Sequence, residues 1–424
     1  MDNKKFEIFK LNNGTEVILV PKSDSLATTV MTTATVGSKY EEKDISGISH
    51  FLEHMGFKGT KKRPTAMDIS TELESLGSSY NASTSYEKTN YYAKVRNKHF
   101  DQALDIISDM YLNSTLPKEE LEKERGVILE EINMYEDSPS SNVGDIFINT
   151  LYGDQPAGWP ILGRKEVIKN LQRQDFVNYK EKYYGSGNTI ITVAGGYDKN
   201  SIKEKLESAF TNIKKDSKLE IPKVKNSQEK PNETIKHKDS DQAHLVLGFK
   251  AFDVHDEREM ALRVLSGILG GGMSSRLFHE IRAKRGLAYY IYSSTGLYTN
   301  NGFIAAQAGV NKNKAEEAVK VILEEFSKLK TTLISEEEIN KTKENIIGST
   351  FLNLETSSSL ANYYTSQRAK NLTPLTPEDF AEKINKVSAQ DIQNVAKDIL
   401  NNKNLNLAVI GPFKNKSFGD ILEI

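Results

Sequence analysis

The first half of the chain shows alternating and helical hydrophobic patterns in succession. Two runs in which apolar and polar side chains alternate, 6–11 and 15–20, flank the pair Asn13-Gly14. Alternation across an Asn-Gly pair predicts a β-hairpin. Periods of two and of 3.6 residues then predict further strands at 28–36, 79–86, 89–96 and 186–196, and helices at about 46–57, 65–76, 98–112 and 117–135.

The second half repeats this order of elements. Its periodicities predict strands at 244–249, 288–294, 302–310 and 405–410, and helices at 256–270, 274–284, 312–329 and 335–350. One local match supports a duplication, since Leu116-Pro-Lys-Glu-Glu-Leu and Leu333-Ile-Ser-Glu-Glu-Glu-Ile each lead into a long amphipathic helix.

Between the halves, the segment 213–241 is rich in Lys, Asn, Ser and Glu, contains Pro222 and Pro231, and has poor periodicity. This composition is typical of a linker. We therefore expect a first domain at 1–212, a linker at 213–241 and a second domain at 242–424. Strands and helices mixed in this way, with hairpins, indicate an α+β fold of two homologous domains, each an antiparallel-rich sheet packed with helices.

Composition excludes several classes of protein. A chain of 424 residues exceeds one typical core, in agreement with two domains. The 56 basic residues are balanced by 58 acidic ones, so the basic excess of a nucleic-acid-binding protein is absent. No run of about 18 apolar residues predicts a membrane span. No apolar stretch follows the basic N-terminus either, which argues against a secretory signal and favours a cytoplasmic protein.

The absence of cysteine excludes disulfides and thiolate metal sites, so any zinc must bind His and carboxylate ligands. The segment His50-Phe-Leu-Glu53-His54 lies in the predicted helix 46–57. Residues four apart share a helix face, so both imidazoles can reach one ion, and Glu53 can lean toward the same site. This order, H-x-x-E-H, is the inverzincin signature. Catalytic zinc usually has three protein ligands, so a third must come from another element.

The helix predicted at 117–135 is the best source of that ligand. Glu124 and Glu131 are seven residues apart and share a face, whereas Glu130 points about 100° away from Glu131. Taken alone, these patterns leave a plainer interpretation open. A histidine on an apolar face is often a satisfied core residue, and glutamates on a helix often form a solvated face.

The residues around the motif carry a family resemblance. The segment Gly47 to Thr60 resembles the metal helix of the pitrilysin/insulinase family, in particular of bacterial processing proteases and of the catalytic subunit of the mitochondrial processing peptidase. The resemblance extends over nearly the whole chain and includes 81–92. It implies one zinc ion per chain on His50, His54 and Glu131, with Glu53 as general base and Glu124 as a carboxylate supporting the ligands.

The second half lacks an equivalent ligand set. Its counterpart of the metal helix, 265–273, has no His pair, and an offset of 218 places Ser349 opposite Glu131. It contains a different pair, Arg282 and Tyr289, whose spacing resembles that of the family's Arg and Tyr. The resemblance implies that this pair holds the substrate backbone and the developing oxyanion. Without it, the two would be a surface charge and a strand aromatic.

The resemblance also implies how substrate binds. Asn81 and Ala82 lie in a strand that resembles the family's substrate edge strand, where a peptide added as a further strand is held by main-chain bonds. We expect a zinc endopeptidase that acts on peptides or unfolded segments in an enclosed chamber. Because the family closes two half-shells and this chain has the length of one half of the clam-shell, we expect a homodimer with composite active sites.

Two other functions fit the same fold. One is a non-catalytic core subunit, as in the respiratory-complex proteins of the family, but such subunits typically lose metal ligands, and this chain keeps all of them. The other is a peptide-binding subunit that needs a different second subunit. The presence of both the zinc motif and the Arg/Tyr pair in one chain favours the homodimer.

Overall fold

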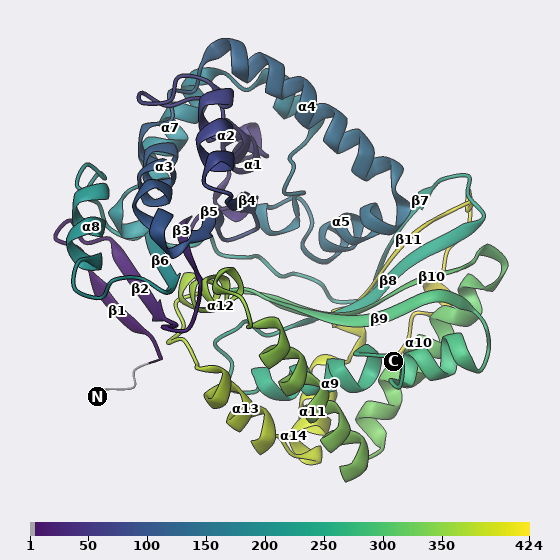
Figure 1. Cartoon of the computed structure of the whole chain (residues 1–424). Coiled ribbons are helices and arrows are strands. Elements are labelled where there is room, and N and C mark those ends of the chain that lie inside the picture. Colours follow the sequence, from purple (N-terminus) through teal and green to yellow (C-terminus); the bar gives the residue numbers. More distant parts are fainter. Residues whose placement is uncertain (1–4) are drawn as a thin grey trace. The chain divides into compact units, whose positions relative to one another are not determined.

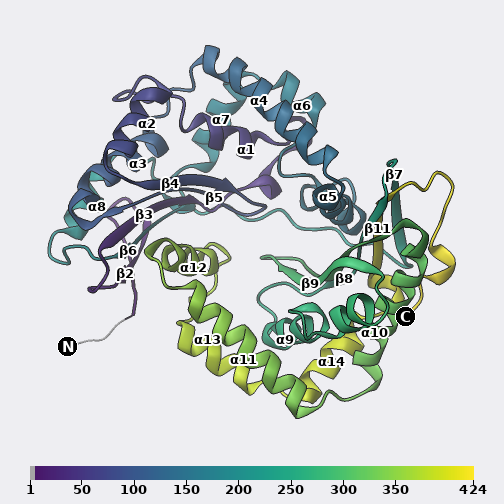
Figure 2. The ribbon, with the colours of Figure 1, turned by 45° about the vertical axis from the view of Figure 1, so that its right-hand side comes forward.

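The computed structural model describes residues 5–424, which divide into two compact units (Figures 1 and 2). Each unit is assembled from three separate stretches of the chain. Unit 1 takes the residues up to Ile132, Pro160–Pro222 and Leu352–Thr376, and unit 2 takes Asn133–Trp159, Lys223–Phe351 and Pro377–Ile424. None of the helices in residues 5–424 is both long and apolar enough to cross a bilayer.

Unit 1 contains a six-stranded sheet in the order β1-β2-β6-β3-β5-β4. Its strands are β1 (Glu7–Lys10), β2 (Glu16–Pro21), β3 (Ala27–Ala34), β4 (Ser79–Thr84), β5 (Thr89–Arg96) and β6 (Thr189–Gly195). All neighbouring pairs are antiparallel except β2 and β6. The hairpin predicted at the Asn13-Gly14 pair is confirmed: β1 pairs with β2, and Gly14 adopts the left-handed φ of +93° that favours glycine.

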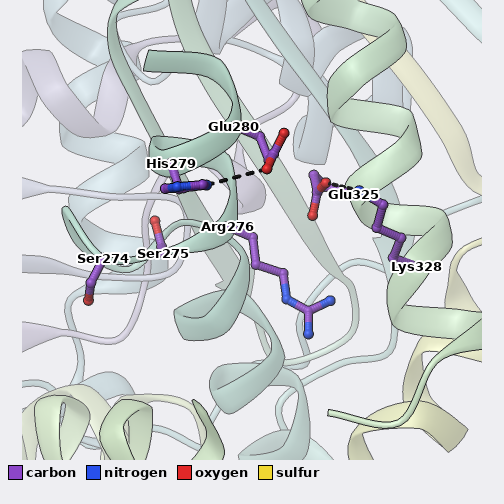
Figure 3. A pocket seen from close by; sticks show the side chains of 7 residues that line it. All are labelled: Ser274, Ser275, Arg276, His279, Glu280, Glu325 and Lys328. Atoms are coloured by element: carbon purple, nitrogen blue, oxygen red, sulfur yellow. Dashed lines mark hydrogen bonds and ion pairs between the residues drawn. The ribbon is translucent and has the colours of Figure 1, made fainter. Parts of the chain in front are cut away.

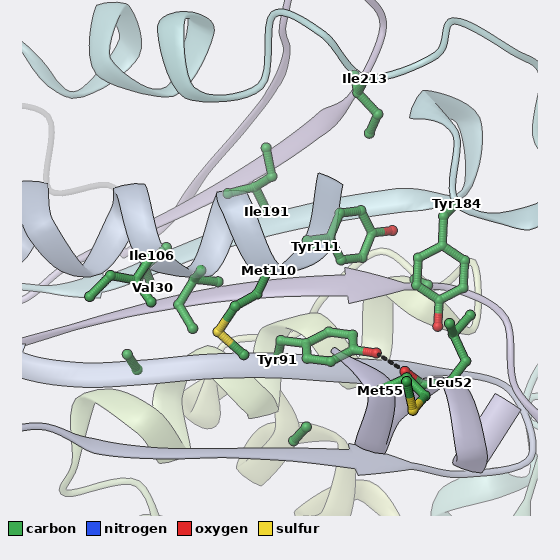
Figure 4. Close-up of a cluster of buried hydrophobic side chains, with 14 of the residues drawn as sticks. Val30, Leu52, Met55, Tyr91, Ile106, Met110, Tyr111, Tyr184, Ile191 and Ile213 are labelled. Atoms are coloured by element: carbon green, nitrogen blue, oxygen red, sulfur yellow. Dashed lines mark hydrogen bonds between the residues drawn. The ribbon is translucent and has the colours of Figure 1, made fainter. Parts of the chain in front are cut away.

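Helices cover both faces of this sheet. Its helices are α1 (Ile48–Met55), α2 (Ala66–Ser75), α3 (Phe100–Asn113), most of α4 (Lys118–Asp137), α6 (Lys165–Asn170), α7 (Arg173–Tyr183), α8 (Ile202–Ala209) and α12 (Ser357–Ala369). On one face, Ile106 and Met110 of α3 pack with Val30 and Ile191 of the strands (Figure 4). On the other face, α12 packs on β6, β3 and β2. Every residue of β6 is therefore buried, as expected for a strand covered on two sides.

Unit 2 contains a five-stranded sheet in the order β7-β11-β8-β10-β9, with only β7 and β11 parallel. Its strands are β7 (Asn232–His237), β8 (Gln242–Ala251), β9 (Ala288–Leu297), β10 (Gly302–Asn311) and β11 (Leu405–Gly411). Its helices are α5 (Pro139–Tyr152), α9 (Glu259–Gly270), a π-helical turn at Phe278–Ala283, α10 (Ala315–Thr331), α11 (Glu336–Asn353), α13 (Pro377–Lys386) and α14 (Ala389–Ile399).

The two sheets share one plan. The order β2-β6-β3-β5-β4 in unit 1 matches β7-β11-β8-β10-β9 in unit 2, and each series begins with its single parallel pair. This agreement confirms the expected α+β fold of two related domains.

The boundaries of the units differ from the contiguous domains 1–212 and 242–424 expected from the sequence. Helix α5 comes from the first half of the chain but packs on β11, β8 and β7 of unit 2. Helix α12 comes from the second half but belongs to unit 1. The expected linker, 213–241, also contains a strand, β7, whose side chains are largely exposed and polar. Its composition resembles that of a linker because β7 lies at the edge of its sheet and buries little.

Candidate metal centre

The helix that carries the H-x-x-E-H motif, α1, is anchored by its buried apolar side chains and at its N-terminus. Its apolar residues Phe51, Leu52 and Met55 are buried in the core of unit 1. Its N-terminus is capped by the buried carboxylate of Glu41, which accepts hydrogen bonds from the backbone N–H groups of Gly47 (2.6 Å) and Ser49 (2.9 Å). A carboxylate at this end also interacts favourably with the helix dipole. The orientation of the motif is therefore fixed from outside the motif itself.

Glu41 offers a test of this anchoring through the stability of the protein. Burial raises its pKa to about 7, although the hydrogen bonds from Gly47 and Ser49 lower it. A raised pKa means that the stabilising contribution is present below the unfolded-state pKa and is lost as pH rises through about 7. The metal-free protein should therefore lose up to about 3 kcal/mol from this group between pH 5 and pH 8. Glu41→Gln should lack that loss.

The measurement is urea unfolding of the metal-free protein and of Glu41→Gln at pH 5, 6.5 and 8. Glu42→Gln is the matched control, because Glu42 is the exposed neighbour of Glu41. A constant difference in unfolding free energy between wild type and Glu41→Gln across this range would contradict the prediction.

Three side chains converge beside α1, two from the motif and one from α4. Within residues 5–424, His50, His54 and Glu131 form the one group of three or more potential metal-ligating residues, with ligand atoms all within 4.8 Å of one another. The Nε2 atoms of His50 and His54 are each 3.7 Å from Oε2 of Glu131, too far for hydrogen bonds. Two ligands of a tetrahedral zinc ion, each about 2.1 Å from the metal, are roughly 3.4 Å apart. The donor set and its spacing therefore fit zinc.

Helix α4 supplies two carboxylates on one face, as its seven-residue spacing predicts. Glu124 is buried and its Oε1 lies 2.9 Å from Nδ1 of His54, while its Oε2 lies 2.6 Å from Nζ of Lys58. Glu130 is exposed. If Glu124 accepts the Nδ1 proton of His54, the Nε2 lone pair of that ring is directed to the side of Glu131. Lys58 is a partner that the sequence did not suggest, although it lies four residues after His54.

The two imidazoles differ in their electrostatic environment. Burial, followed by the proximity of His54, lowers the pKa of His50 to about 3, so this ring is neutral over the ordinary pH range. Within residues 5–424, the buried Nδ1 of His50 has no hydrogen-bond partner. Burial would also lower the pKa of His54, but the hydrogen bond to Glu124 and the neighbouring carboxylates outweigh it and raise that pKa. A neutral imidazole is the form that binds a metal.

Glu53 is one residue from His54 but is held differently from the three converging side chains. Its Oε2 accepts a hydrogen bond of 2.6 Å from Oγ1 of Thr84, the last residue of β4. Burial raises the pKa of Glu53, and the bond from Thr84 opposes that rise. Thr84 was missed from the sequence because nothing in the local pattern indicates which strand end lies opposite α1.

Strand β4 lies at one of the two edges of the sheet in unit 1. It pairs with β5 only, so its other edge has no strand partner among residues 5–424. Asn81 is exposed, and its Oδ1 accepts a hydrogen bond of 2.9 Å from the backbone N–H of Ala82. The side chain of Asn81 thus accepts the hydrogen bond of a main-chain N–H group of the edge strand, that of Ala82. The ladder ends at Thr84, so this edge leads to the residue that contacts Glu53.

Arg282 and Tyr289 lie together in unit 2, as their spacing suggests. The guanidinium of Arg282, in the π-helical turn, is 5.0 Å from the centre of the Phe278 ring and 5.6 Å from that of Tyr289. Tyr289 is the second residue of the outer strand β9, and 74% of its surface is exposed. Both side chains are therefore available to a ligand.

The segment that leads into this turn lines a second feature, a cavity of about 290 Å³ (Figure 3). Its charged side chains are engaged in pairs: Arg276 with Glu338 at 2.7 Å, and Glu325 with Lys328 at 2.5 Å. Glu280 pairs with Lys284 and Arg285. The cavity therefore offers no unpaired acid or base that would make it a second reaction site.

Comparisons with known proteins agree with this geometry. Residues 17–165 match the sequence model of the family described as Insulinase (Peptidase family M16), and residues 170–346 match that of the Peptidase M16 inactive domain. An uncharacterized zinc protease of Rickettsia felis is 36% identical over 98% of this chain and 100% of its own length. The uncharacterized zinc protease YmxG of Bacillus subtilis is 34% identical over 96% of this chain and 98% of its own.

Among solved structures, the crystal structure of a protease from Helicobacter pylori is similar in fold. It has a TM-score of 0.91 and 28% identity, and the match covers 96% of this chain and 99% of that one.

Proposed function

We propose, because the chain belongs to the insulinase family of peptidases (family M16), that it is a zinc metallopeptidase which hydrolyses peptides or unfolded polypeptide segments. The observation that carries this proposal is the convergence of His50, His54 and Glu131, whose ligand atoms lie within 4.8 Å of one another. The carboxylate of Glu53 lies near this group without belonging to it. When bound there, zinc supplies Lewis acidity, polarising a carbonyl and lowering the pKa of a water molecule.

The chain's own residues provide the proton transfers and the positioning. Glu53 takes a proton from the attacking water and delivers it to the leaving amine, because it lies near His54 and Glu131 without being a ligand and, unlike Glu124, is not bound to a ligand histidine. Its raised pKa, caused by burial, brings it closer to the operating pH of a general base. Thr84 holds Oε2 of Glu53 at 2.6 Å and fixes the direction of that carboxylate.

The free edge of β4 is the proposed binding place of the peptide. A peptide that adds as a strand would be held by main-chain bonds, so its sequence would matter little. Such a peptide would displace Oδ1 of Asn81 from the N–H of Ala82. An extended peptide along β4 would also pass Thr84, and thereby Glu53. We propose that cleavage takes place inside an enclosed chamber, as the family resemblance implies.

The test compares an unstructured peptide of some tens of residues with a compact folded protein of equal length. The purified chain, loaded with zinc, should cleave the peptide at least tenfold faster, because only an extended chain can pair with an edge strand. Cleavage should stop when a chelator removes the metal and return when zinc is added. Mass spectrometry of the products reports both results.

Absence of cleavage in a chain shown to hold zinc would favour the alternative, a non-catalytic or peptide-binding subunit of the same fold. Equal rates for peptide and folded protein would contradict the enclosed chamber but leave the peptidase in place.

We further propose that two copies form a homodimer in which Arg282 and Tyr289 of one copy complete the site on the zinc-binding unit of the other. The Arg–Tyr pair is exposed and ready for such a contact. Mixing inactive Glu53→Gln chains with inactive Arg282→Ala chains should then restore activity. One site of the mixed dimer would combine an intact zinc unit with an intact Arg/Tyr pair.

The complementation experiment needs confirmed subunit exchange and folded variants. Lys284→Ala is the matched control for Arg282, because it is an exposed cation near the same turn, and it should be active without a partner variant. A mixture that stays inactive after exchange would mean that Arg282 acts within its own chain or takes no part in turnover.

A further inference from the structure

Unit 1 contains a cavity of about 290 Å³ whose lining includes none of the proposed metal ligands. It is formed by the end of α3, the segment 114–116 that leads to α4, one side of α7 and residues 212–214. Tyr111, Tyr184 and Ile213 contribute to the wall and are labelled together in Figure 4. With Leu112 and Val177 they form an apolar part of a lining whose remainder is mostly polar or charged.

One cation in this cavity lacks a partner among the residues that the structure describes. Lys180 of α7 is half-buried, and no hydrogen bond or ion pair joins its Nζ to any atom of residues 5–424. The carboxylate whose charge acts on Lys180, Asp109, is buried and already accepts hydrogen bonds from Arg63 at 3.0 Å and from Asn113 at 2.9 Å. Burial lowers the pKa of Lys180 to about 8, which reflects how poorly its charge is compensated.

The other charges of the lining add to the positive character near Lys180. Arg173 uses Nε and Nη2 on the carbonyl oxygens of Leu116 (2.8 Å) and Thr115 (3.0 Å), which leaves its positive charge without a carboxylate partner among the described residues. The Nζ of Lys214 binds the carbonyl oxygen of Glu181 at 3.2 Å. The single carboxylate of the lining, Glu181, is exposed.

We propose that this cavity binds a small monocarboxylate with an apolar body. Its carboxylate would supply the missing partner of Lys180, since an ammonium in an apolar setting gains most from an opposite charge. Its hydrocarbon part would pack against the rings of Tyr111 and Tyr184. A ligand of this class is distinct from the peptide proposed for β4, and its binding does not require peptidase activity.

The wall of the cavity is connected to the helices α1 and α4, so a bound ligand would contact a segment linked to both. Leu116 adopts a φ of +50°, a left-handed conformation that is strained for a bulky residue, and the contact from Arg173 holds it there. Residues 114 and 115 also bond to the end of α1 and to the segment after it: Oγ of Ser114 donates to the carbonyl of Met55, the last residue of α1, and N of Thr115 donates to that of Gly59. One wall of the cavity therefore joins the two helices that carry the metal ligands.

The test is isothermal titration calorimetry of the full, metal-free chain with phenylpropionate. We expect saturable binding by the wild type and at least tenfold weaker binding by Lys180→Gln. Lys180→Arg should bind within a few-fold of the wild type, because it keeps the charge. Lys182→Gln is the matched control on the same helix and should bind like the wild type, since Lys182 is exposed and pairs with Glu42.

Two further ligands decide the chemistry in the wild-type chain alone, even if Lys180→Gln fails to fold. Phenylpropylamine, which has a similar body and the opposite charge, should not bind. Inorganic phosphate should bind at least tenfold more weakly than phenylpropionate, because it lacks the apolar body. Equal binding of the acid and the amine, no binding of the acid, or unchanged affinity in a folded Lys180→Gln would each overturn the proposal.

Discussion

Glu53→Gln should lower peptide turnover by at least about 100-fold while the chain still binds one zinc ion, a loss in the range attributed to general base catalysis. Glutamine keeps the size of the side chain and can still accept the hydrogen bond that Thr84 donates at 2.6 Å. It cannot take a proton from water. The group of His50, His54 and Glu131 is left unchanged, because Glu53 is not a member of it.

The measurements are zinc content by elemental analysis and initial rates on an unstructured peptide, with the far-UV spectrum as a check of folding. Glu130→Gln is a suitable control, since it removes an exposed carboxylate of α4 near the same site. Loss of zinc in Glu53→Gln would indicate that Glu53 is a ligand. Turnover near the wild-type rate would remove it from the mechanism.

His54→Ala and Glu131→Ala should each lose metal and activity together, with zinc affinity falling by more than about 100-fold. Loss of a residue that is hydrogen-bonded to a metal ligand typically costs 10- to 100-fold in metal affinity, and loss of a ligand itself should cost more. Glu124→Gln should fall in the intermediate range, because the amide would accept less strongly from Nδ1 of His54 at 2.9 Å. Glu130→Ala should bind zinc normally.

Competition with a chromophoric chelator at fixed pH measures these affinities. The comparison of Glu130 with Glu131 is the sharpest part, since the two residues are adjacent on α4 and differ in the face they occupy. Metal loss in Glu130→Ala with retention in Glu131→Ala would shift the ligand by one residue and contradict the placement of Glu131 beside both imidazoles.

The parts of the site that arise from helical spacing could be predicted from the sequence. His50 and His54 share a face because they are four residues apart, and Glu124 and Glu131 share one because they are seven apart. Helical spacing did not decide which of these two glutamates joins His50 and His54 as a ligand. The family resemblance implied Glu131. The convergence of α1 and α4 agrees with Glu131, which lies 3.7 Å from both rings.

The contacts that periodicity could not supply join segments far apart in the chain. Thr84 reaches Glu53 from a strand end 31 residues away, and a buried Glu41 caps α1 without a recognisable capping motif.

The prediction of the fold from periodicity was limited in the same way. Strands and helices with strong periodicity were found, but β7 was taken for linker because its exposed face is polar. The exchange of α5 and α12 depends on tertiary packing, which has no local signature.

That exchange makes the two halves of the chain mutually dependent. A cut anywhere in 213–231 would put the sheet of unit 1 and α12 on different fragments, and the first fragment alone would expose the apolar cluster that contains Ile18, Val20 and Met31. It would equally separate the sheet of unit 2 from α5. Although the plan of each sheet points to an ancestral single domain, neither half now contains a complete fold. The smallest part of this protein that can be excised, transplanted or inherited with its structure intact is therefore both halves together.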